Sequence, residues 1–533
     1  MSVYFTVEDV NRLAQNSDLF DRMALFDEYL HVGRVYLETF RSGIMASDDA
    51  LVKVKQYFTQ RGIRVSGGIT PTRPDKAFWQ LLCYNSPDDV ALLESAVRRT
   101  AAHFDDFILD DFFYTDCRCP ACCAAKGDEG FAAYRLDLMA RVSNKVISVA
   151  RQVNPNAKAI IKFPNWYPSY SFTGYNPQVQ RKIFDGVHTG TETRNRLTTQ
   201  QSLPRYVSYA ILRYMENIAP GKNGGGWFDS FDCPSHRDYV EQGVLTLLAG
   251  AKEITLFCFG YIQEAYLPVL GHQLKVLDHL LGQLGQPVGV SCYLPFNAFG
   301  ENYLAETLGM IGIPVEPMAE YDARPAAMLL TEAASVDADI VRKMERLLGD
   351  GKTVITTAGF WKNACDLGGE VFRWTGAVRK AHRLAMGIHD TGFKHYYDTH
   401  GDLLFPEITC PTNDAWAVVA GMDRSGAFPI LIKQMWGNGT LYVLNIPCSP
   451  YDITTLPVPV LDEIRQAVCA SLPVSLRGDA EVGLFVYDNQ QVVVYSFADV
   501  NSHGKICDAT GEVVAEVELR PGEMQALSLQ KSF

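Results

Sequence analysis

The sequence predicts an α/β protein that combines a (β/α)8 TIM barrel, a second α/β domain and a small antiparallel β domain, and three observations support this. Short apolar strands alternate with longer amphipathic helices up to about residue 285, which is typical of βα units around a parallel sheet. A second series of this kind begins near Pro287. The remaining C-terminal segment alternates apolar and polar side chains, as half-buried antiparallel strands do.

Eight candidate strands fall in the first domain, residues 1–285, and their alternation with helices favours a closed barrel over an open sheet. The first strand is the weakest, and without it the barrel would have seven. The helices between them include Asp49–Arg61, Asp88–His103, Ala132–Gln152 and Pro204–Asn217. The strands are Val3–Val7, Arg34–Phe40, Arg64–Thr70, Phe107–Phe113, Ala159–Pro164, Gly186–Glu192, Gly226–Ser230 and Glu253–Gly260.

The second and third domains are expected to cover residues 286–472 and 473–533. A strand in PVGVSCYLP, a helix over Tyr303–Ile311 and the helix–turn–strand pattern of DIVRKMERLLGDGKTVITTAG begin the second domain. Gly437-Asn438-Gly439 predicts a β-hairpin later in it. The third is expected to be a small β-sandwich-like domain with a turn at Asp488-Asn489.

Composition and charge exclude several classes of protein. The 533 residues carry 48 Lys and Arg against 61 Asp and Glu, a net charge of −13, with ordinary globular composition. No basic block is present, so neither nucleic acid nor an anionic membrane is expected as a partner. The N-terminus lacks the basic and apolar regions of a signal peptide, and no apolar run approaches the ~18–20 residues of a spanning helix. We therefore expect a cytoplasmic protein.

Acidic residues stand at the C-terminal ends of the predicted barrel strands, where the reactive groups of such barrels lie. Asp110 and Asp111 end FILDDFF, Glu192 lies in GTETR, and Asp229 lies in WFDSFD. A doubled aspartate at the end of an apolar strand costs too much desolvation without partners to be accidental. These four carboxylates are the candidate catalytic residues.

Aromatic and charged residues accompany these carboxylates, a combination that suits carbohydrate because sugar C–H faces stack on aromatic rings. Lys162 is the expected cation beside a carboxylate. Two carboxyls about 5–5.5 Å apart would retain the anomeric configuration, whereas about 6.5–9.5 Å would invert it. Other strand-end aromatic residues are Trp79, Phe112, Tyr114, Tyr167 and Tyr261. The candidate substrate-binding residues are Glu38, Lys162, Trp166, Tyr36, Trp227, Asp232 and Arg194.

Four cysteines crowd the loop after FILDDFF, and in a cytoplasmic protein they favour a metal site over disulfides. Cys117, Cys119 and Cys122 can wrap one tetrahedral Zn²⁺, and Cys83 in the preceding βα loop is well placed as the fourth ligand. Cys123 could take the place of Cys122. Four cysteine ligands close the coordination sphere, so the zinc would be structural.

Other reactive motifs are missing or have a plainer explanation. No GxGxxG or GxxxxGK[ST] phosphate loop follows a strand, and no GxSxG elbow of a serine hydrolase occurs. The glycine-rich segment Gly221–Asp232 precedes a strand instead of opening a helix, which favours a close backbone approach or a tight turn. His188 is expected to be a buried core residue.

The acidic strand end followed by CxCxxC, with a further cysteine one βα unit earlier, resembles the β-galactosidases of glycoside hydrolase family 42. The resemblance implies a barrel with a four-cysteine zinc site, then a class I glutamine-amidotransferase-like trimerisation domain and a small β domain. Asp111 then matches the acid/base position and Asp229 the nucleophile position, although the family has Glu at both. A strand-four Asp paired with Glu192 on strand six is instead similar to retaining α-galactosidase-like barrels. The chain therefore resembles a divergent relative.

We expect a retaining glycoside hydrolase that acts on a small oligosaccharide or glycoside, with a galactoside as one option. One alternative is a non-catalytic carbohydrate-binding protein on a degenerate barrel. Another is a lyase that uses Lys162 as a base or Schiff-base amine. The resemblance also implies a homo-oligomer, a trimer or a dimer.

Overall fold

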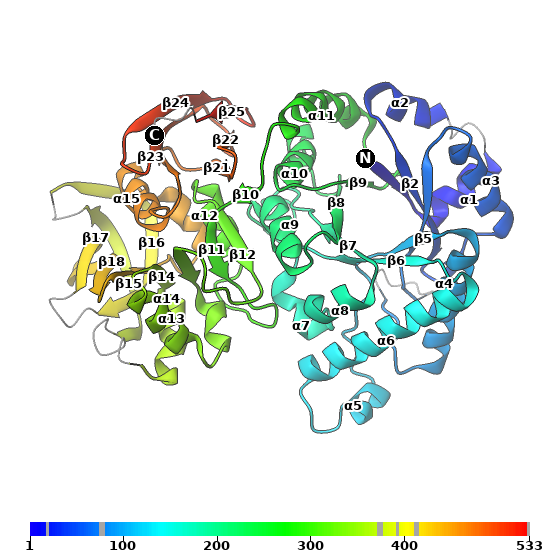
Figure 1. Cartoon of the computed structure of the whole chain (residues 1–533), viewed down its shortest axis with the longest axis horizontal. Helices are drawn as coiled ribbons and strands as arrows, with labels where there is room; N and C mark the ends of the chain where they lie inside the picture. Colours follow the sequence, from blue (N-terminus) through cyan, green and yellow to red (C-terminus); the bar gives the residue numbers. More distant parts are fainter. Residues whose placement is uncertain (17–20, 74–79, 370–376, 391–393, 410–414, 530–533) are drawn as a thin grey trace. The chain divides into compact units, whose positions relative to one another are not determined.

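The structure is a computed structural model that describes residues 1–16, 21–73, 80–369, 377–390, 394–409 and 415–529. The chain forms two compact units (Figure 1). The first contains Met1–Leu203 and Val207–Gly282, and the second contains Gln283–Phe533 together with the short segment Pro204–Tyr206.

The first unit is the predicted closed barrel. Neighbouring strands are parallel, and β1 pairs with both β2 and β9, which closes the ring. The weak first strand is therefore confirmed, and the short β3 (Ile44–Met45) only extends β2 as a hairpin. The barrel strands are β1 (Ser2–Phe5), β2 (Arg34–Arg41), β4 (Arg64–Ile69), β5 (Asp106–Leu109), β6 (Lys158–Phe163), β7 (Gly186–Gly190), β8 (Asn223–Asp229) and β9 (Ile254–Phe257).

Helices cover the outside of these strands (Figure 1). Side-chain caps fix several of their starts: Thr6 and Ser235 form capping boxes, and Ser47 and Ser86 accept bonds from the third residue of their helices. The helices are α1 (Val7–Gln15), α2 (Asp21–Tyr29), α3 (Asp48–Thr59), α4 (Pro87–His103), α5 (Pro120–Lys126), α6 (Phe131–Val153), α7 (Tyr170–Thr173), α8 (Pro177–Ile183), α9 (Val207–Ile218), α10 (His236–Leu248) and α11 (Leu267–Leu281).

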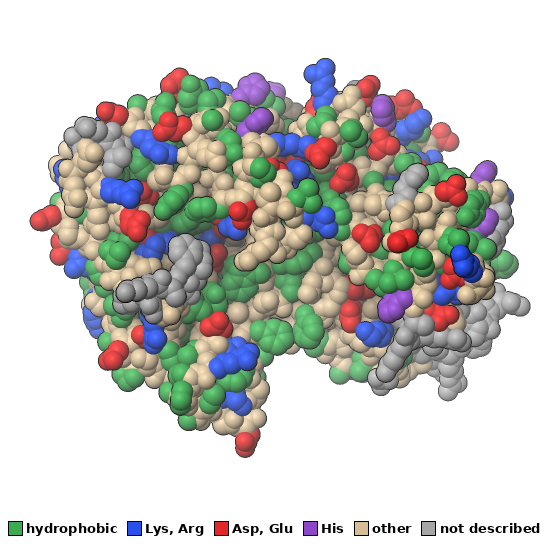
Figure 2. Space-filling view, turned by 180° about the vertical axis from the view of Figure 1, so that it is seen from behind, with side chains coloured by type: hydrophobic (Ala, Val, Ile, Leu, Met, Phe, Trp, Pro, Cys, Tyr) green, Lys and Arg blue, Asp and Glu red, His purple; other side chains and the backbone are tan. Residues whose placement is uncertain are grey.

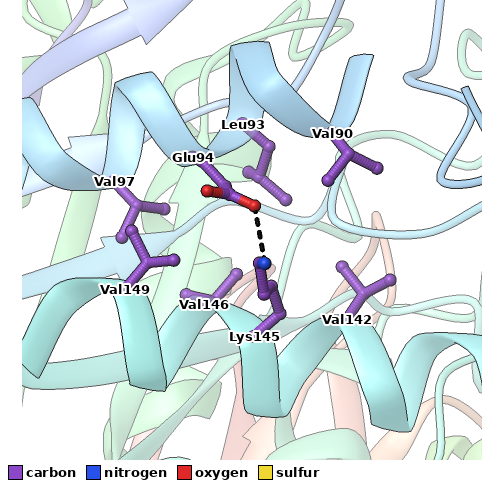
Figure 3. Close-up of a pocket in the computed structure, with 8 residues that line it drawn as sticks. All are labelled: Val90, Leu93, Glu94, Val97, Val142, Lys145, Val146 and Val149. Carbon is purple, nitrogen blue, oxygen red and sulfur yellow. Dashed lines mark ion pairs between the residues drawn. The ribbon is translucent and has the colours of Figure 1, made fainter. Parts of the chain in front are cut away.

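The outer helices α4 and α6 show how this layer packs. Valines and a leucine face one another across the two helices, and the Glu94–Lys145 ion pair, 2.9 Å long, spans the groove between them (Figure 3). The space left is about 30 Å³, roughly the volume of one water molecule. This groove is helix packing and offers no binding site.

Side chains fill the barrel interior. Tyr4, Tyr36, Ile108, Trp227 and Cys258 form a buried cluster. His188 is buried as expected, with Nε2 3.0 Å from the Thr255 hydroxyl. Burial lowers the pKa of this imidazole to about 4, so it is neutral at pH 7.

The second unit begins with a mostly parallel sheet of order β12-β11-β13-β14-β19, which the antiparallel strands β18, β17, β15 and β16 extend. Gly437 and Asn438 make the expected hairpin between β18 and β19. The strands are β11 (Val290–Tyr293), β12 (Val315–Met318), β13 (Ala327–Leu330), β14 (Thr353–Thr357), β15 (Ala377–His389), β16 (Tyr396–Thr409), β17 (Ala415–Asp423), β18 (Gly426–Trp436) and β19 (Gly439–Leu444). The helices are α12 (Leu304–Met310), α13 (Ile340–Gly349), α14 (Ala358–Ala364) and α15 (Val458–Val468).

The C-terminal part of this unit is the expected antiparallel β structure. One sheet has the order β10-β21-β22-β25 and the other β20-β23-β24. The turn at Asp488-Asn489 joins β21 to β22. The strands are β10 (Pro287–Val288), β20 (Val474–Gly478), β21 (Val482–Tyr487), β22 (Gln491–Ser496), β23 (Ser502–Asp508), β24 (Val513–Leu519) and β25 (Met524–Ser528).

Charged side chains of both signs are interspersed over the face seen in Figure 2. Among the described residues, no helix combines the length and apolarity that a membrane crossing requires.

Candidate active site and cysteine cluster

Lys162 forms the centre of a charged cluster at the C-terminal end of the barrel. Its Nζ lies 2.8 Å from Glu192 Oε1, 3.0 Å from Asp111 Oδ2 and 3.4 Å from Asp110 Oδ1. The same ammonium lies 4.3 Å from the ring centre of Trp227. Burial opposes the charge on Lys162, but the three carboxylates outweigh it and raise the pKa of its ammonium. Lys162 is therefore permanently protonated.

A second layer of the cluster surrounds Glu38, at the end of β2. The Glu38 carboxylate is fully buried and accepts hydrogen bonds from the Tyr4 hydroxyl at 2.7 Å, the Val7 N–H at 2.8 Å, the Arg41 guanidinium and the Thr70 hydroxyl. With every oxygen engaged, Glu38 anchors its neighbours and has no room for a substrate.

Asp110 is tied to that layer. Its Oδ2 accepts from Thr70 at 3.1 Å and from Arg41 at 3.3 Å, and its Oδ1 accepts the backbone N–H of Asp111 at 2.8 Å. Burial acts to raise the pKa of this carboxyl, but the charges of Lys162 and Arg41 lower it below its ordinary value. Asp110 is thus a buried, ionised carboxylate.

Asp111, the next residue, is more exposed than Asp110. Its side chain is 20% exposed and Lys162 is the cation that it contacts. Burial, together with the negative charges of Asp110 and Glu192, raises the pKa of Asp111 to about 7, although Lys162 acts in the opposite direction. The Tyr175 hydroxyl donates a hydrogen bond to the backbone carbonyl of Asp111 at 2.8 Å. This carboxyl can therefore carry a proton at neutral pH.

Glu192 follows β7 and points at Lys162. Burial raises the pKa of its carboxyl, and the positive charge of Lys162 partly offsets that effect. A Cβ on Gly190 would lie 2.6 Å from Glu192 Oε2, so a side chain at this position would displace the Glu192 carboxylate. The amide of Asn165 donates to the Glu192 carbonyl and fixes the loop.

Asp229, at the end of β8, belongs to a separate ion pair. Arg194 holds it in a fork, with Nε 2.9 Å from Oδ1 and a terminal nitrogen 2.7 Å from Oδ2. The backbone N–H of Phe231 donates to Oδ1 at 3.0 Å. Arg194 has a φ of 56°, in the left-handed region. Its backbone N–H donates a hydrogen bond to the Gln242 side-chain oxygen at 3.1 Å.

The remaining sequence-predicted residues occupy different places. Trp166 packs edge-on against Tyr114, with ring centres 5.2 Å apart, and is partly exposed. Trp227 and Tyr36 are both buried in the barrel. Trp227 lies beside Lys162, and the Tyr36 hydroxyl lies 3.3 Å from Glu253 Oε1. Asp232 is exposed on the loop after β8. Trp79 lies outside the described residues.

Sequence reasoning missed several residues of the site. Arg41 and Thr70 bridge Glu38 to Asp110, and Asn165 supports the Glu192 loop. Arg41 and Thr70 immediately follow or end predicted strands, so their position was a usable signal. Phe231 was also missed; it is 39% exposed and packs against the predicted Tyr261, which is 58% exposed, with 5.6 Å between ring centres.

The four predicted cysteines come together as one group. The Sγ atoms of Cys83, Cys117, Cys119 and Cys122 all lie within 4.8 Å of one another, with Cys83 3.5 Å from Cys122 and 3.7 Å from Cys119. Ligands 2.3 Å from a tetrahedral zinc lie about 3.8 Å apart, so the cluster could hold such an ion. Cys123 is exposed and bonds to the Arg118 carbonyl instead.

Neighbouring residues support this cluster. Cys119 caps α5, and Pro120 stands at the first position of that helix. The Asn85 amide donates to Cys122 Sγ at 3.1 Å. Arg135 on α6 donates to the carbonyls of Asp116 and Cys117. The loop that begins with Asp111 is therefore held at its far end by the cysteine group.

Comparison with known proteins gives the following relatives. A family model described as a probable glycosyl hydrolase catalytic domain matches residues 1–271, and one described as the second domain of the uncharacterized protein SSO3021 matches residues 285–449. Protein SSO3021 of Saccharolobus solfataricus is 24% identical over 497 residues, which cover 84% of this chain and 81% of the relative.

Solved structures share the fold. A catalytic mutant of Gan42B, a GH42 β-galactosidase from G. stearothermophilus, superposes with a TM-score of 0.67 at 11% identity and covers 98% of this chain and 97% of its own. The exo-β-1,4-mannosidase Op5Man5 from Opitutaceae bacterium strain TAV5 gives 0.54 at 11% identity, with 83% and 91% covered. The chain thus has the fold and the domain architecture expected from its resemblance to glycoside hydrolase family 42.

Proposed function

This chain belongs to the family of probable glycosyl hydrolases through the catalytic domain in residues 1–271, and from that premise we propose that it hydrolyses a glycosidic bond with Asp111 as the proton donor. One observation carries the proposal. Asp111 is partly exposed and burial among other carboxyls raises its pKa to about 7, which suits a general acid near neutral pH.

Glu192 is the proposed nucleophile. It and Asp111 contact the same lysine nitrogen at 2.8 Å and 3.0 Å, so the contacting oxygens are at most about 5.8 Å apart. That limit favours the ~5–5.5 Å spacing of retaining enzymes over the ~6.5–9.5 Å of inverting ones. Asp229 is a weaker candidate, because Arg194 engages both of its oxygens.

The reaction then takes two steps. Asp111 gives its proton to the glycosidic oxygen while a Glu192 oxygen attacks the anomeric carbon, so the bond to the leaving group breaks and a glycosyl ester forms. Asp111, now ionised, removes a proton from water, and the resulting hydroxide cleaves the ester and regenerates both carboxyls. Lys162 stays charged and stabilises Glu192 when it leaves as a carboxylate.

The sugar is a further part of the proposal. Trp166 and Tyr114 offer partly exposed rings beside the loops of this site. The structural neighbours include proteins named as β-galactosidases and one named as an exo-β-1,4-mannosidase, so β-galactosides and β-mannosides are the first substrates to test. The neighbours' names support only this choice of substrates.

The test uses Asp111→Asn and Glu192→Gln, with Asp116→Asn, an exposed aspartate of the same loop, as the control. Each site variant is expected to lose at least about 10²-fold in kcat. Proton NMR of the first product formed should show the anomer of the substrate. Full activity of both folded site variants would refute the assignment, and binding without turnover by the wild type would favour a non-catalytic carbohydrate-binding protein.

The lyase alternative requires a neutral Lys162 amine. Three carboxylates raise the pKa of that ammonium instead, which disfavours both a base and a Schiff base at this position. Absence of a borohydride-trapped adduct with a confirmed substrate would agree with hydrolysis.

We further propose that the cysteine cluster binds one structural Zn²⁺ through Cys83, Cys117, Cys119 and Cys122, because four thiolates leave no open position. We also propose that the protein is cytoplasmic and that it forms a homo-oligomer, either a trimer or a dimer. Light scattering of the purified protein would measure the oligomeric state.

A further inference from the structure

We propose that a pocket in the second unit is a binding site for a neutral saccharide, independent of the chemistry at Asp111. The pocket has a volume of about 190 Å³. Its walls come from the loop after β11 and the segment after β13, two strands that pair directly in the sheet. The lining residues are Asn297, Ala298, Phe299, Glu332, Ala333, Ser335 and Val336.

The topology of the sheet explains why a crevice forms there. After β11 the chain passes through α12 to β12, on one side of β11. After β13 it passes through α13 to β14, on the opposite side. The two loops therefore diverge, and in open α/β sheets ligands bind at such a reversal, outside the C-terminal ends of the strands.

The partly buried carboxylate of Glu301 fixes these loops. Oε2 of Glu301 accepts the Glu332 N–H at 2.8 Å and the Thr357 hydroxyl at 2.5 Å, and Oε1 accepts the Gly359 N–H at 3.1 Å. A Cβ on Gly359 would lie 2.6 Å from the Glu301 carboxyl carbon, so this approach requires glycine. The pocket walls are thus held in place before any ligand arrives, which lowers the entropy cost of binding.

The chemistry of the walls selects the ligand. Phe299 is 63% exposed and supplies an aromatic face for the C–H surface of a sugar ring. The Asn363 amide donates a hydrogen bond to Glu332 Oε1 at 2.9 Å, and the remaining lone pairs of that carboxylate can accept hydrogen bonds from sugar hydroxyls. Asn297 adds an exposed amide that both donates and accepts. No Lys, Arg or His lines the pocket, which disfavours an anionic ligand.

Calorimetric titration of the full-length Asp111→Asn protein tests the proposal, with galactose, mannose and lactose as probes. We expect two classes of site for at least one probe. Phe299→Ala and Glu332→Gln should each weaken one class about tenfold or more, because they remove the stacking face and the charged acceptor. Trp166→Ala should weaken only the other class, and Val500→Ala, an exposed residue of the second unit, should change neither.

The outcomes separate this proposal from the proposed hydrolysis. A class of binding sites that is weakened by Phe299→Ala but not by Trp166→Ala supports the pocket. This holds even if no class of sites responds to Trp166→Ala, in which case the assignment of the barrel site fails while the pocket stands. Isotherms unchanged by both Phe299→Ala and Glu332→Gln, with unchanged thermal unfolding, would overturn it. Heat of binding with ethanolamine but with none of the sugars would also overturn it, in favour of a cationic ligand.

Discussion

Replacing Lys162 by Met removes the cation that Asp110, Asp111 and Glu192 share and keeps a side chain of similar length. Breaking a buried ion pair by deleting one partner costs about 3–5 kcal/mol of unfolding free energy, because a buried charge is left without compensation. Here three carboxylates lose contacts of 2.8–3.4 Å. We therefore expect a loss of about 3–5 kcal/mol at pH 8, above the pKa of about 7 of Asp111 in the wild type.

The loss should shrink as the pH falls. Lys162 lowers the pKa of all three carboxyls, so its removal raises their pKa values in the folded variant. A carboxyl whose pKa is raised by folding stabilises the protein below its unfolded pKa, and that stability disappears as the pH rises through the folded pKa. One extra proton bound by the folded variant is worth about 1.36 kcal/mol per pH unit, or about 2.7 kcal/mol between pH 8 and pH 6.

Urea unfolding of the wild type and the variant at pH 6, 7 and 8 measures this difference. Lys158→Met is the matched control, because Lys158 begins the same strand and is exposed. It should cost little at any pH. A loss in Lys162→Met that is equal at pH 6 and pH 8, or no greater than in the control, would refute the shared-cation argument.

The other predictions concern separate parts of the site. The rate kcat/KM of the wild type should fall as the pH rises through about 7, because Asp111 loses its proton, and a flat profile up to pH 9 would contradict this assignment. Cys119→Ser should lose about one zinc per chain in elemental analysis and should unfold at a lower temperature than the wild type. The Cys123→Ser variant, altered at an exposed cysteine, should keep the zinc and the wild-type unfolding temperature. Native protein that contains no metal would refute the zinc proposal. Gly190→Ala should displace Glu192 and lower kcat while circular dichroism stays unchanged, and unaltered kcat would argue against Glu192.

Strand positions in the barrel were accessible from sequence because each strand is short, apolar and separated from the next by an amphipathic helix. The exact bounds differ for β5, which ends at Leu109. The carboxyls of FILDDFF therefore lie in the loop beyond it.

The roles of individual site residues were less accessible, because side-chain direction depends on the tertiary structure. Nothing in the sequence distinguishes Asp110, which points at Arg41 and Thr70, from its neighbour Asp111, which is partly exposed. The Arg194–Asp229 fork joins the loop after β7 to the end of β8, 35 positions further along the chain, a pairing that only the fold reveals. The cysteine cluster was predictable, since three of its members share one loop and Cys83 precedes them by one βα unit.

Charges alternate around the mouth of the barrel. Glu38 contacts Arg41, Arg41 contacts Asp110, Asp110 contacts Lys162, and Lys162 contacts Glu192. The positive charge of Arg194 acts on Glu192, and its guanidinium pairs with Asp229. Every cation in this series lies between two carboxylates, so each of the four carboxylates has a cationic neighbour within the series.

Asp111 is the fifth carboxyl and lies outside that alternation. Among the described residues its ion pair is with Lys162, whose charge Asp110 and Glu192 already share. If all five carboxyls were ionised, three cations would leave two uncompensated negative charges in a mostly buried cluster. Binding a proton is therefore favourable, and the proton binds to the carboxyl whose charge is least compensated. The alternation therefore supplies a physical reason why a general acid would be found at Asp111 and an ionised partner across Lys162 at Glu192.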